Sequence, residues 1–230
     1  MGEYVFPVTL PSVVVHGTAA RYAVQRIFCV GQNYAAHARE MGGDPQREPP
    51  FFFMKPASAL VADGALVPYP SRTTNFHHEV ELVAAIGRPG QDIAVADALT
   101  HVYGYAVGND YTRRDLQTAA RTNGRPWDIS KGFDHSAGVG TLYPVAAAGP
   151  VERASLWLTV NGQTRQRAAI ADMIWDVAGI VSLLSSYFAL LPGDVIFTGT
   201  PAGVGPLLVG DVVSAGIDGL GTLTHTIVSG

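Results

Sequence analysis

Residues 76–86 constrain the fold more than any other part of the chain. Read as a β-strand, they place Glu79, Glu81 and Val83 on one face and the apolar residues between them on the other, because side chains alternate with period two. The second half of the run, Val83 to Ile86, is apolar on both faces. Such a run is typical of a strand that lies inside the protein with a packed layer on each side.

The two glutamates of this strand would lie about 6.5 Å apart at the backbone and can converge on one point. Carboxylates on an interior strand repel each other and lose hydration, so they require protonation, basic partners or a cation. With oxygen ligands alone, the cation is expected to be Mg²⁺, Mn²⁺ or Ca²⁺. Asp110, which follows the apolar run Val102–Val107, is a candidate third ligand. Two simpler readings stay open: a half-exposed strand with a solvated acidic face, and Asp110 as the N-cap of the next helix.

Composition narrows the class of protein. The 230 residues are 47% hydrophobic, enough for one large core or two small ones. Only 15% are charged, and 26 glycines and 15 prolines favour short strands and turns over long helices. A net charge of −4 without a basic run argues against nucleic acid as a partner. Without a signal-peptide pattern or an apolar run long enough for a bilayer, we expect a soluble cytoplasmic protein.

The first 25 residues are expected to form an extended lead-in. A strand at Ile27–Val30 and a turn are predicted to precede a short helix from Tyr34 to Met41, with Asn33 as its N-cap. On that helix His37 and Glu40 would share a face, which suits a general base acting on water, although a surface ion pair fits the same spacing. The helix is followed by a polar, proline-containing loop at residues 44–50. Residues 38–50 could form a mobile lid. The single cysteine, Cys29, excludes an intrachain disulfide and reads as a buried structural thiol.

The middle of the chain contains two candidate cationic residues. A helix predicted over residues 112–122 carries Arg114 and Gln117 on one face, where an arginine fork suits a carboxylate. An ordinary surface charge is the alternative. Lys131 stands among small and apolar residues and is expected to turn inward toward the acidic site, unless it is a solvated lysine at a strand end.

The C-terminal part is expected to supply scaffold. Asn161-Gly162 predicts a type I′ hairpin, and residues 173–188 have helical spacing, with Asp172 as a possible cap and Pro192-Gly193 as the stop. A buried strand at residues 195–197 leads into a glycine-rich turn that lacks the lysine of a P-loop. Its backbone N–H groups and the Thr200 hydroxyl could hold a carboxylate. Residues 211–228 predict a last hairpin.

Several of these stretches together resemble the fumarylacetoacetate hydrolase family, and most closely its fumarylpyruvate hydrolases. The resemblance spans about residues 26–225, in family order and spacing, and it rests on residues 29–41, 50–56, 77–81, 108–117, 126–134, 171–175 and 191–205. It implies an α+β fold, a β-rich roll of mixed strands with flanking helices, formed by a single catalytic domain over residues 26–230. A homodimer without membrane or nucleic-acid partners is also implied.

For the site, the resemblance implies that Mg²⁺ or Mn²⁺ is held by Glu79, Glu81 and Asp110. His37 and Glu40 would form a water-activating dyad, and Lys131 falls on the family's catalytic lysine. The family's substrate-contacting positions fall on Arg114, Gln117 and Thr200. One departure is Gln32, where relatives often carry arginine; it could alter specificity.

The implied reaction is hydrolysis of a carbon–carbon bond in a 2,4-dioxo acid, fumarylpyruvate giving fumarate and pyruvate late in the gentisate route of aromatic degradation. Acylpyruvate hydrolysis, oxaloacetate decarboxylation and isomerisation of a dienoate diacid are alternatives on the same scaffold. An iron oxygenase would instead use His77 and Glu79 with a third ligand from His101, His135 or His225. A non-catalytic metal-binding protein with this fold is a further alternative.

Overall fold

The computed structural model describes residues 5–7, 9–41 and 50–230. In this part of the chain the largest sheet has the order β4-β3-β15-β8-β9-β11-β5, and β12 also pairs with β9. Its strands are β3 (Arg26–Gly31), β4 (Phe51–Lys55), β5 (Leu60–Ala62), β8 (Val80–Ile86), β9 (Val102–Asp110), β11 (Ala137–Val139), β12 (Tyr143–Pro144) and β15 (Asp194–Phe197). The pairs β3–β15 and β5–β11 are parallel and the other pairs antiparallel, so the sheet is mixed.

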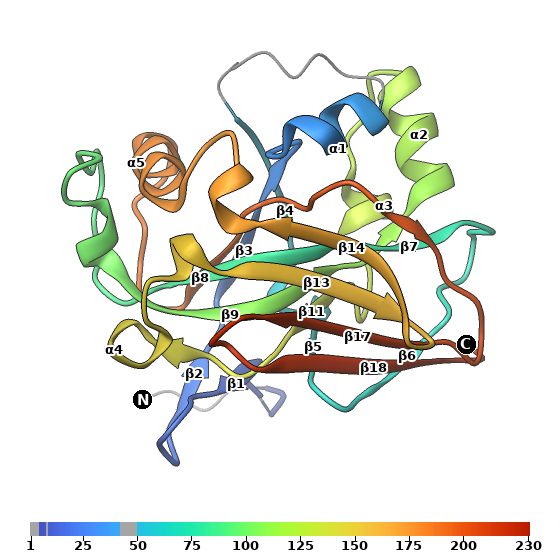
Figure 1. Ribbon diagram of the computed structural model, residues 1–230, viewed down its shortest axis with the longest axis horizontal. Coiled ribbons are helices and arrows are strands. Elements are labelled where there is room, and N and C mark those ends of the chain that lie inside the picture. Colours follow the sequence, from blue (N-terminus) through green and yellow to red (C-terminus); the bar gives the residue numbers. More distant parts are fainter. Residues whose placement is uncertain (1–4, 8, 42–49) are drawn as a thin grey trace.

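A second sheet, in the order β14-β13-β17-β18-β6, packs over one face of the first (Figure 1). It contains β6 (Leu66–Pro68), β13 (Ser155–Val160), β14 (Gln163–Ala169), β17 (Val212–Ile217) and β18 (Thr222–Val228). The turn between β13 and β14 has φ of 52° at Asn161 and 77° at Gly162, the backbone that a type I′ turn requires. Both predicted hairpins of the C-terminal part are therefore confirmed.

The remaining elements are short. A three-stranded sheet joins β10 (Thr112–Arg113), β7 (Phe76–His78) and β16 (Gly205–Pro206), and the first described strands form a hairpin of β1 (Ser12–Val14) and β2 (Arg21–Ala23). The α-helices are α1 (Ala35–Glu40), α2 (Arg114–Thr122), α3 (Asp128–Lys131), α4 (Val145–Ala148) and α5 (Val177–Tyr187). Single 3-10 turns lie at Ala57–Ala59, Ala98–His101, Val151–Arg153 and Ile170–Asp172. Figure 1 shows α1 and α2 together at one end of the sheets.

Strand β8 is buried on both faces, as its sequence predicts. Leu82 and Ala84 belong to the core that the large sheet shares with the second sheet and α5. Val83 and Ala85 belong to a second core on the opposite face, which the β1–β2 hairpin helps to cover. A β-rich roll with few flanking helices is thus confirmed as the fold class.

The predicted strand over residues 76–86 is interrupted at Glu79, and this prediction was wrong in detail. Strand β7 joins the three-stranded sheet, whereas β8 joins the large one. The Glu79 N–H donates to Asn109 Oδ1 at 2.8 Å, and the Glu79 carbonyl accepts from the Asp110 N–H at 2.8 Å. A side chain thus replaces one bond of the ladder, which lets the strand change sheets at the glutamate.

The predicted helix caps also differ. Asn33 does not cap α1, whose N-cap position is Tyr34. The side chain that caps α5 is Asp176, which accepts from the Gly179 N–H at 2.8 Å, and the helix ends at Tyr187, before the predicted stop. Asp110 ends β9 four residues before α2 begins, so the reading of Asp110 as an N-cap was wrong.

Candidate active site

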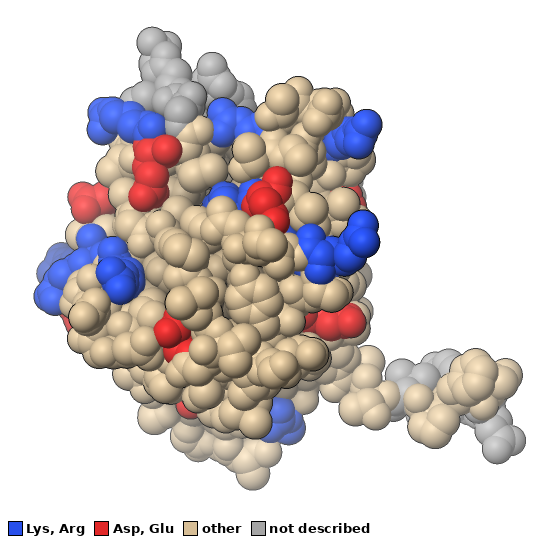
Figure 2. All heavy atoms as spheres, turned by 90° about the vertical axis from the view of Figure 1, so that its right-hand side faces the viewer, with Lys and Arg blue, Asp and Glu red and all other residues tan. Residues whose placement is uncertain are grey.

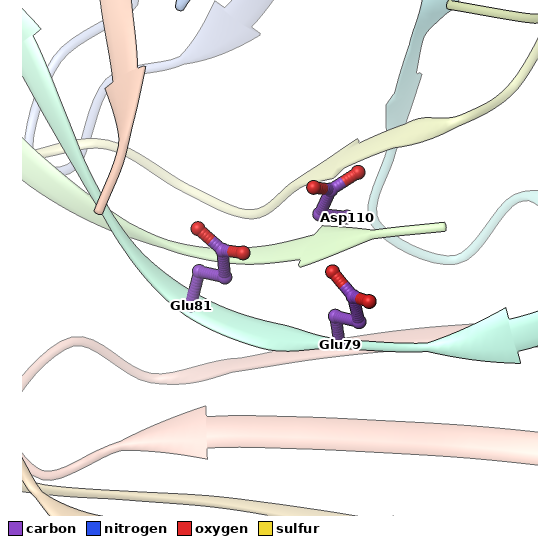
Figure 3. A group of neighbouring side chains, drawn as sticks. All are labelled: Glu79, Glu81 and Asp110. Carbon is purple, nitrogen blue, oxygen red and sulfur yellow. The ribbon is translucent and has the colours of Figure 1, made fainter. Parts of the chain in front are cut away.

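Three carboxylates converge where β8 begins and its neighbour β9 ends. Glu79 lies at the break before β8, Glu81 lies two residues further on, and Asp110 is the last residue of the antiparallel neighbour β9 (Figure 3). Their ligand oxygens all lie within 4.8 Å of one another. All three residues are at most 4% exposed, so the reading of a solvated acidic face was wrong.

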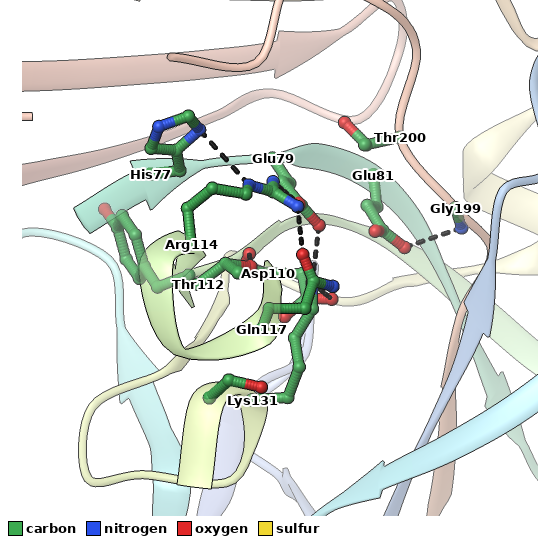
Figure 4. Close-up of polar contacts among 12 residues, drawn as sticks. His77, Glu79, Glu81, Asp110, Thr112, Arg114, Gln117, Lys131, Gly199 and Thr200 are labelled. Carbon is green, nitrogen blue, oxygen red and sulfur yellow. Dashed lines mark hydrogen bonds and ion pairs between the residues drawn. The ribbon is translucent and has the colours of Figure 1, made fainter. Parts of the chain in front are cut away.

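Buried cations surround two of these carboxylates. Lys131 Nζ lies 2.7 Å from both Glu79 Oε2 and Asp110 Oδ2, and Lys55 Nζ lies 2.8 Å from Asp110 Oδ1. Arg114 donates to the other oxygen of Glu79 (Figure 4). Burial alone would raise the pKa of Glu79, but Lys131 and Arg114 hold that pKa well below its usual range. Lys131 is 2% exposed, so the reading of a solvated lysine was wrong.

Glu81 has a different environment. Burial, followed by the charges of Asp110 and Glu79, raises the pKa of Glu81. Its Oε2 accepts from the Gly199 N–H at 2.6 Å. Gly199 has φ of 102°, and a Cβ there would lie 2.6 Å from Asn33 Cβ, so the turn requires glycine. The glycine-rich turn does hold a carboxylate, but it is the carboxylate of Glu81.

The donor set fits a hard divalent cation. Carboxylate oxygens are the preferred ligands of Mg²⁺ and Mn²⁺. Asp110 Oδ1 lies near Lys55 but accepts no hydrogen bond of good geometry from any described residue, and among those residues Glu81 has no ion pair. Both groups therefore retain oxygen lone pairs inside a buried site.

Helix α1 places His37 beside this group. His37 is 5% exposed, and its Nδ1 lies 2.9 Å from Glu40 Oε2. Because the carboxylate accepts, Nδ1 carries a proton, and in the neutral tautomer with this contact the lone pair lies on Nε2. Glu40 Oε1 in turn accepts from the Gly203 N–H at 3.0 Å. The pair thus connects α1 to the glycine-rich turn, with His37 buried and Glu40 exposed.

The predicted substrate-side residues lie on two elements. Arg114 and Gln117 are adjacent on α2, each 6% exposed, and the Arg114 guanidinium also donates to Gln117 Oε1. Arg114 is therefore not a surface charge. The Thr200 hydroxyl donates to the Val80 carbonyl at 2.9 Å and accepts from Gln166 Nε2 at 2.7 Å. One lone pair of that hydroxyl remains for a ligand.

A single pocket collects nearly all the predicted site residues. Glu40 is not among its lining residues but holds His37. The predicted residues that line the pocket are His37, Glu79, Glu81, Asp110, Arg114, Gln117, Lys131 and Thr200, and Gln32 joins them. The other lining residues are Val30, Gly31, Met41, Phe53, Arg121 and Trp127. Of the predicted lid, residues 42–49 lie outside the described part of the chain.

Lys55 is the residue that sequence reasoning missed. It is 1% exposed, and its ammonium group donates to the carbonyls of Tyr111 and Lys131 besides pairing with Asp110. A signal was present, because the chain contains thirteen arginines and only two lysines, Lys55 and Lys131. Both lysines lie at the same aspartate, Asp110.

Comparison with known proteins decides the family. The family described as "Fumarylacetoacetate (FAA) hydrolase C-terminal" matches residues 26–228. This chain belongs to the fumarylacetoacetate hydrolase family. The crystal structure of fumarylpyruvate hydrolase from Pseudomonas aeruginosa, in complex with Mn²⁺ and pyruvate, is 52% identical to this chain with a TM-score of 0.96, over 99% of this chain and 100% of that one.

Two further proteins are similar to this chain over most of their length. Fumarylpyruvate hydrolase from a Ralstonia species is 43% identical over 80% of this chain and 95% of its own. A mitochondrial oxaloacetate tautomerase from Arabidopsis thaliana is 42% identical over 85% of this chain and 87% of its own. The prediction of a family enzyme most like the fumarylpyruvate hydrolases is confirmed.

A divalent, oxygen-ligated metal is confirmed for this type of site by the Mn²⁺ of the Pseudomonas aeruginosa structure and by the buried carboxylate group of this chain. The iron-oxygenase alternative lacks its ligands, because within the described residues the carboxylate group is the only cluster that meets the geometry of a metal site. Cys29 is fully buried, and burial raises the pKa of its thiol. No helix among the described residues is both long and apolar enough to cross a membrane.

Proposed function

We propose that this protein hydrolyses fumarylpyruvate to fumarate and pyruvate in a reaction that depends on Mg²⁺ or Mn²⁺. The observation that carries the proposal is the His37–Glu40 pair, because His37 lines the same pocket as the three carboxylates and Glu40 holds it there. Similarity to the fumarylpyruvate hydrolases of Pseudomonas aeruginosa and a Ralstonia species supports the choice of substrate.

Glu79, Glu81 and Asp110 would hold the metal ion. When bound, Mg²⁺ or Mn²⁺ supplies positive charge that attracts the oxygens of the pyruvyl end and stabilises the enolate of the leaving pyruvate. Glu81 and Asp110 lie on neighbouring strands of one sheet and Glu79 lies at the break before β8, so the backbone positions all three carboxylates before substrate arrives. The Gly199 N–H keeps Glu81 turned toward the other two carboxylates.

His37 and Glu40 would activate water. With the proton on Nδ1 directed at Glu40, the lone pair on Nε2 can accept a proton from a water molecule, and the Glu40 carboxylate stabilises the resulting imidazolium. The water oxygen then bonds to the carbonyl carbon on the fumaroyl side. The bond from that carbon to the methylene between the two carbonyls breaks, and its electron pair leaves as the enolate of pyruvate, which is protonated to pyruvate.

Lys131 would donate to the oxyanion that forms when water adds, because its ammonium group is buried and already directed into the carboxylate group. We assign Arg114, Gln117 and Thr200 to substrate positioning, since all three line the pocket. We further propose that residues 26–230 act as a single catalytic domain of a cytoplasmic homodimer, late in gentisate breakdown. The family resemblance supports these assignments.

A turnover assay with three substrates tests the proposal. Fumarylpyruvate, acetylpyruvate and oxaloacetate are each followed with Mn²⁺ and again after EDTA, and the products are identified. We expect equal amounts of fumarate and pyruvate, with fumarylpyruvate preferred and all turnover lost in EDTA. A preference for oxaloacetate would overturn the hydrolase assignment in favour of decarboxylation or tautomerisation, which the Arabidopsis thaliana relative makes the second candidate.

The metal ligands are tested independently of turnover by calorimetric titration with Mn²⁺. Glu81→Gln should weaken binding strongly, because it removes one of the three carboxylates. Glu152→Gln, an exposed glutamate outside the pocket, is the matched control and should leave binding unchanged.

A further inference from the structure

Helix α2 presents a third polar residue to the pocket beyond Arg114 and Gln117. Arg121 follows them at the spacing i, i+3, i+7, which keeps all three on one helix face. Arg114 and Gln117 are each 6% exposed, whereas Arg121 is exposed. Arg121 also lines a neighbouring hollow with Glu40, Met41 and Thr118. The helix face therefore runs from the buried floor of the pocket to its mouth, and Arg121 lies at the mouth.

The cations of the pocket differ in what they already bind. The guanidinium of Arg114 is engaged by Glu79 and Gln117, and the ammonium of Lys131 by Glu79 and Asp110. Arg121 donates from Nη1 to the Met41 carbonyl at 2.7 Å, and it has no carboxylate within ion-pair distance among the described residues. A guanidinium has five donors in a fork that matches a carboxylate, so Arg121 keeps most of its donors for a ligand.

We propose that Arg121 binds the carboxylate at the far end of the substrate and so selects dicarboxylic 2,4-dioxo acids over monocarboxylic ones. The inference rests on the proposed function, which places the dioxo end at Glu79, Glu81 and Asp110. Seven residues of helix span about 10 Å, so Arg121 is one substrate length away from Arg114. A diacid held at its dioxo end directs its second carboxylate toward the mouth, where Arg121 is the pocket cation without a carboxylate partner among the described residues.

Charge-assisted hydrogen bonds of this kind change affinity by roughly 10- to 100-fold. The experiment compares Arg121→Gln, Arg121→Lys and the control Arg125→Gln on two substrates. Arg125 is exposed just beyond the end of α2 and does not line the pocket, so its variant loses the same charge nearby. Fumarylpyruvate and acetylpyruvate share the reacting dioxo end, but acetylpyruvate has a methyl group in place of the distal carboxylate arm.

We expect Arg121→Gln to lower kcat/KM for fumarylpyruvate about 10- to 100-fold, mainly by raising KM, and to leave acetylpyruvate nearly unchanged. Arg121→Lys should recover part of the loss, because it restores the charge but not the fork. Arg125→Gln should behave as the wild type on both substrates.

Other outcomes would overturn the inference. If Arg121→Gln lowers kcat/KM equally for both substrates through a lower kcat, Arg121 acts through its bond to Met41. If kcat/KM changes for neither substrate, the distal carboxylate lies elsewhere. If the wild-type protein binds fumarylpyruvate in calorimetry without cleaving it, the proposed reaction fails, but a weaker affinity in Arg121→Gln still supports the inference. If it neither binds nor cleaves the diacid, both fail.

Discussion

His37 is the single side chain whose replacement tests the chemistry most directly. We expect His37→Ala to lower kcat by about 10²- to 10⁴-fold, because His37 is the one proton acceptor besides the three carboxylates among the described residues that line the pocket. Affinity for Mn²⁺ should change little, since His37 is not one of the three carboxylates. Steady-state kinetics with calorimetric Mn²⁺ binding measures both quantities. Arg39→Ala, on the exposed side of the same helix, is the control, and unchanged turnover in His37→Ala would refute the dyad.

The Lys55 side chain contributes to stability through its contact with Asp110. Lys55→Met leaves Asp110 buried without one of its two ammonium partners. Removing one partner of a buried ion pair costs about 3–5 kcal/mol, so the free energy of unfolding should fall by that amount. Urea unfolding in EDTA measures it. Arg88→Met removes a charge from the surface and should change stability by less than about 0.5 kcal/mol. A similar small change in Lys55→Met would mean that Lys131 alone neutralises Asp110.

At the scale of elements, Asn33 connects the loops that carry the site. Its Nδ2 donates to the carbonyls of Trp175 and Thr198, and its Oδ1 accepts from the Trp175 N–H, each at 2.8 Å. Asn33→Ala removes three buried hydrogen bonds worth about 1 kcal/mol each, so we expect unfolding to become easier by about 3 kcal/mol. Chemical denaturation measures the loss. Asn123→Ala, at the exposed end of α2, should lose under about 1 kcal/mol, and equal losses in both variants would argue against this link.

Local signals predicted the elements that depend on neighbours in sequence. Period-two and continuous apolar runs predicted β8 and β9. The spacing of His37 and Glu40 predicted their contact on α1. The failures at Asn33 and Lys55 share one cause, which is a partner distant in sequence. Asn33 bonds to residues about 140 and 165 positions away instead of capping its helix. Lys55 meets Asp110 only when β4 and β9 lie in one sheet. Propensity and spacing do not encode such pairs.

For the molecule as a whole, His225 links the two main sheets and makes stability depend on pH. Its Nε2 faces the Ala62 carbonyl and its Nδ1 faces the Tyr111 hydroxyl, each at 2.9 Å. Since the carbonyl can only accept, Nε2 carries the proton, and in the neutral ring Nδ1 accepts from the tyrosine hydroxyl. Burial lowers the pKa of His225 below its usual 6.5, although the Ala62 carbonyl and Asp63 oppose the shift.

Because its pKa is lower in the folded protein, His225 destabilises the fold as the pH falls. Below pH 6.5 the unfolded chain gains a proton at His225 that the folded protein does not take up, so stability present above that pH is lost as pH falls. The slope from this group is at most about 1.4 kcal/mol per pH unit. We expect His225→Gln to flatten the pH dependence of the free energy of unfolding between pH 7.5 and 5.5 in urea titrations, by up to about 1.4 kcal/mol. An unchanged slope would assign the dependence to other groups.

The position of β15 has a consequence for how the protein acquires its site during synthesis. This strand lies between β3 and β8 in the large sheet and pairs in parallel with β3, although residues 26–31 and 194–197 are far apart in sequence. A nascent chain that has emerged only to residue 190 therefore contains β8 and β9, which carry the carboxylates. It still lacks β15, the strand that joins them to β3 and α1. Loops of this length close slowly, and exposed strand edges recruit chaperones or aggregate. We expect the dyad and the carboxylates to meet only after nearly the whole polypeptide has left the ribosome.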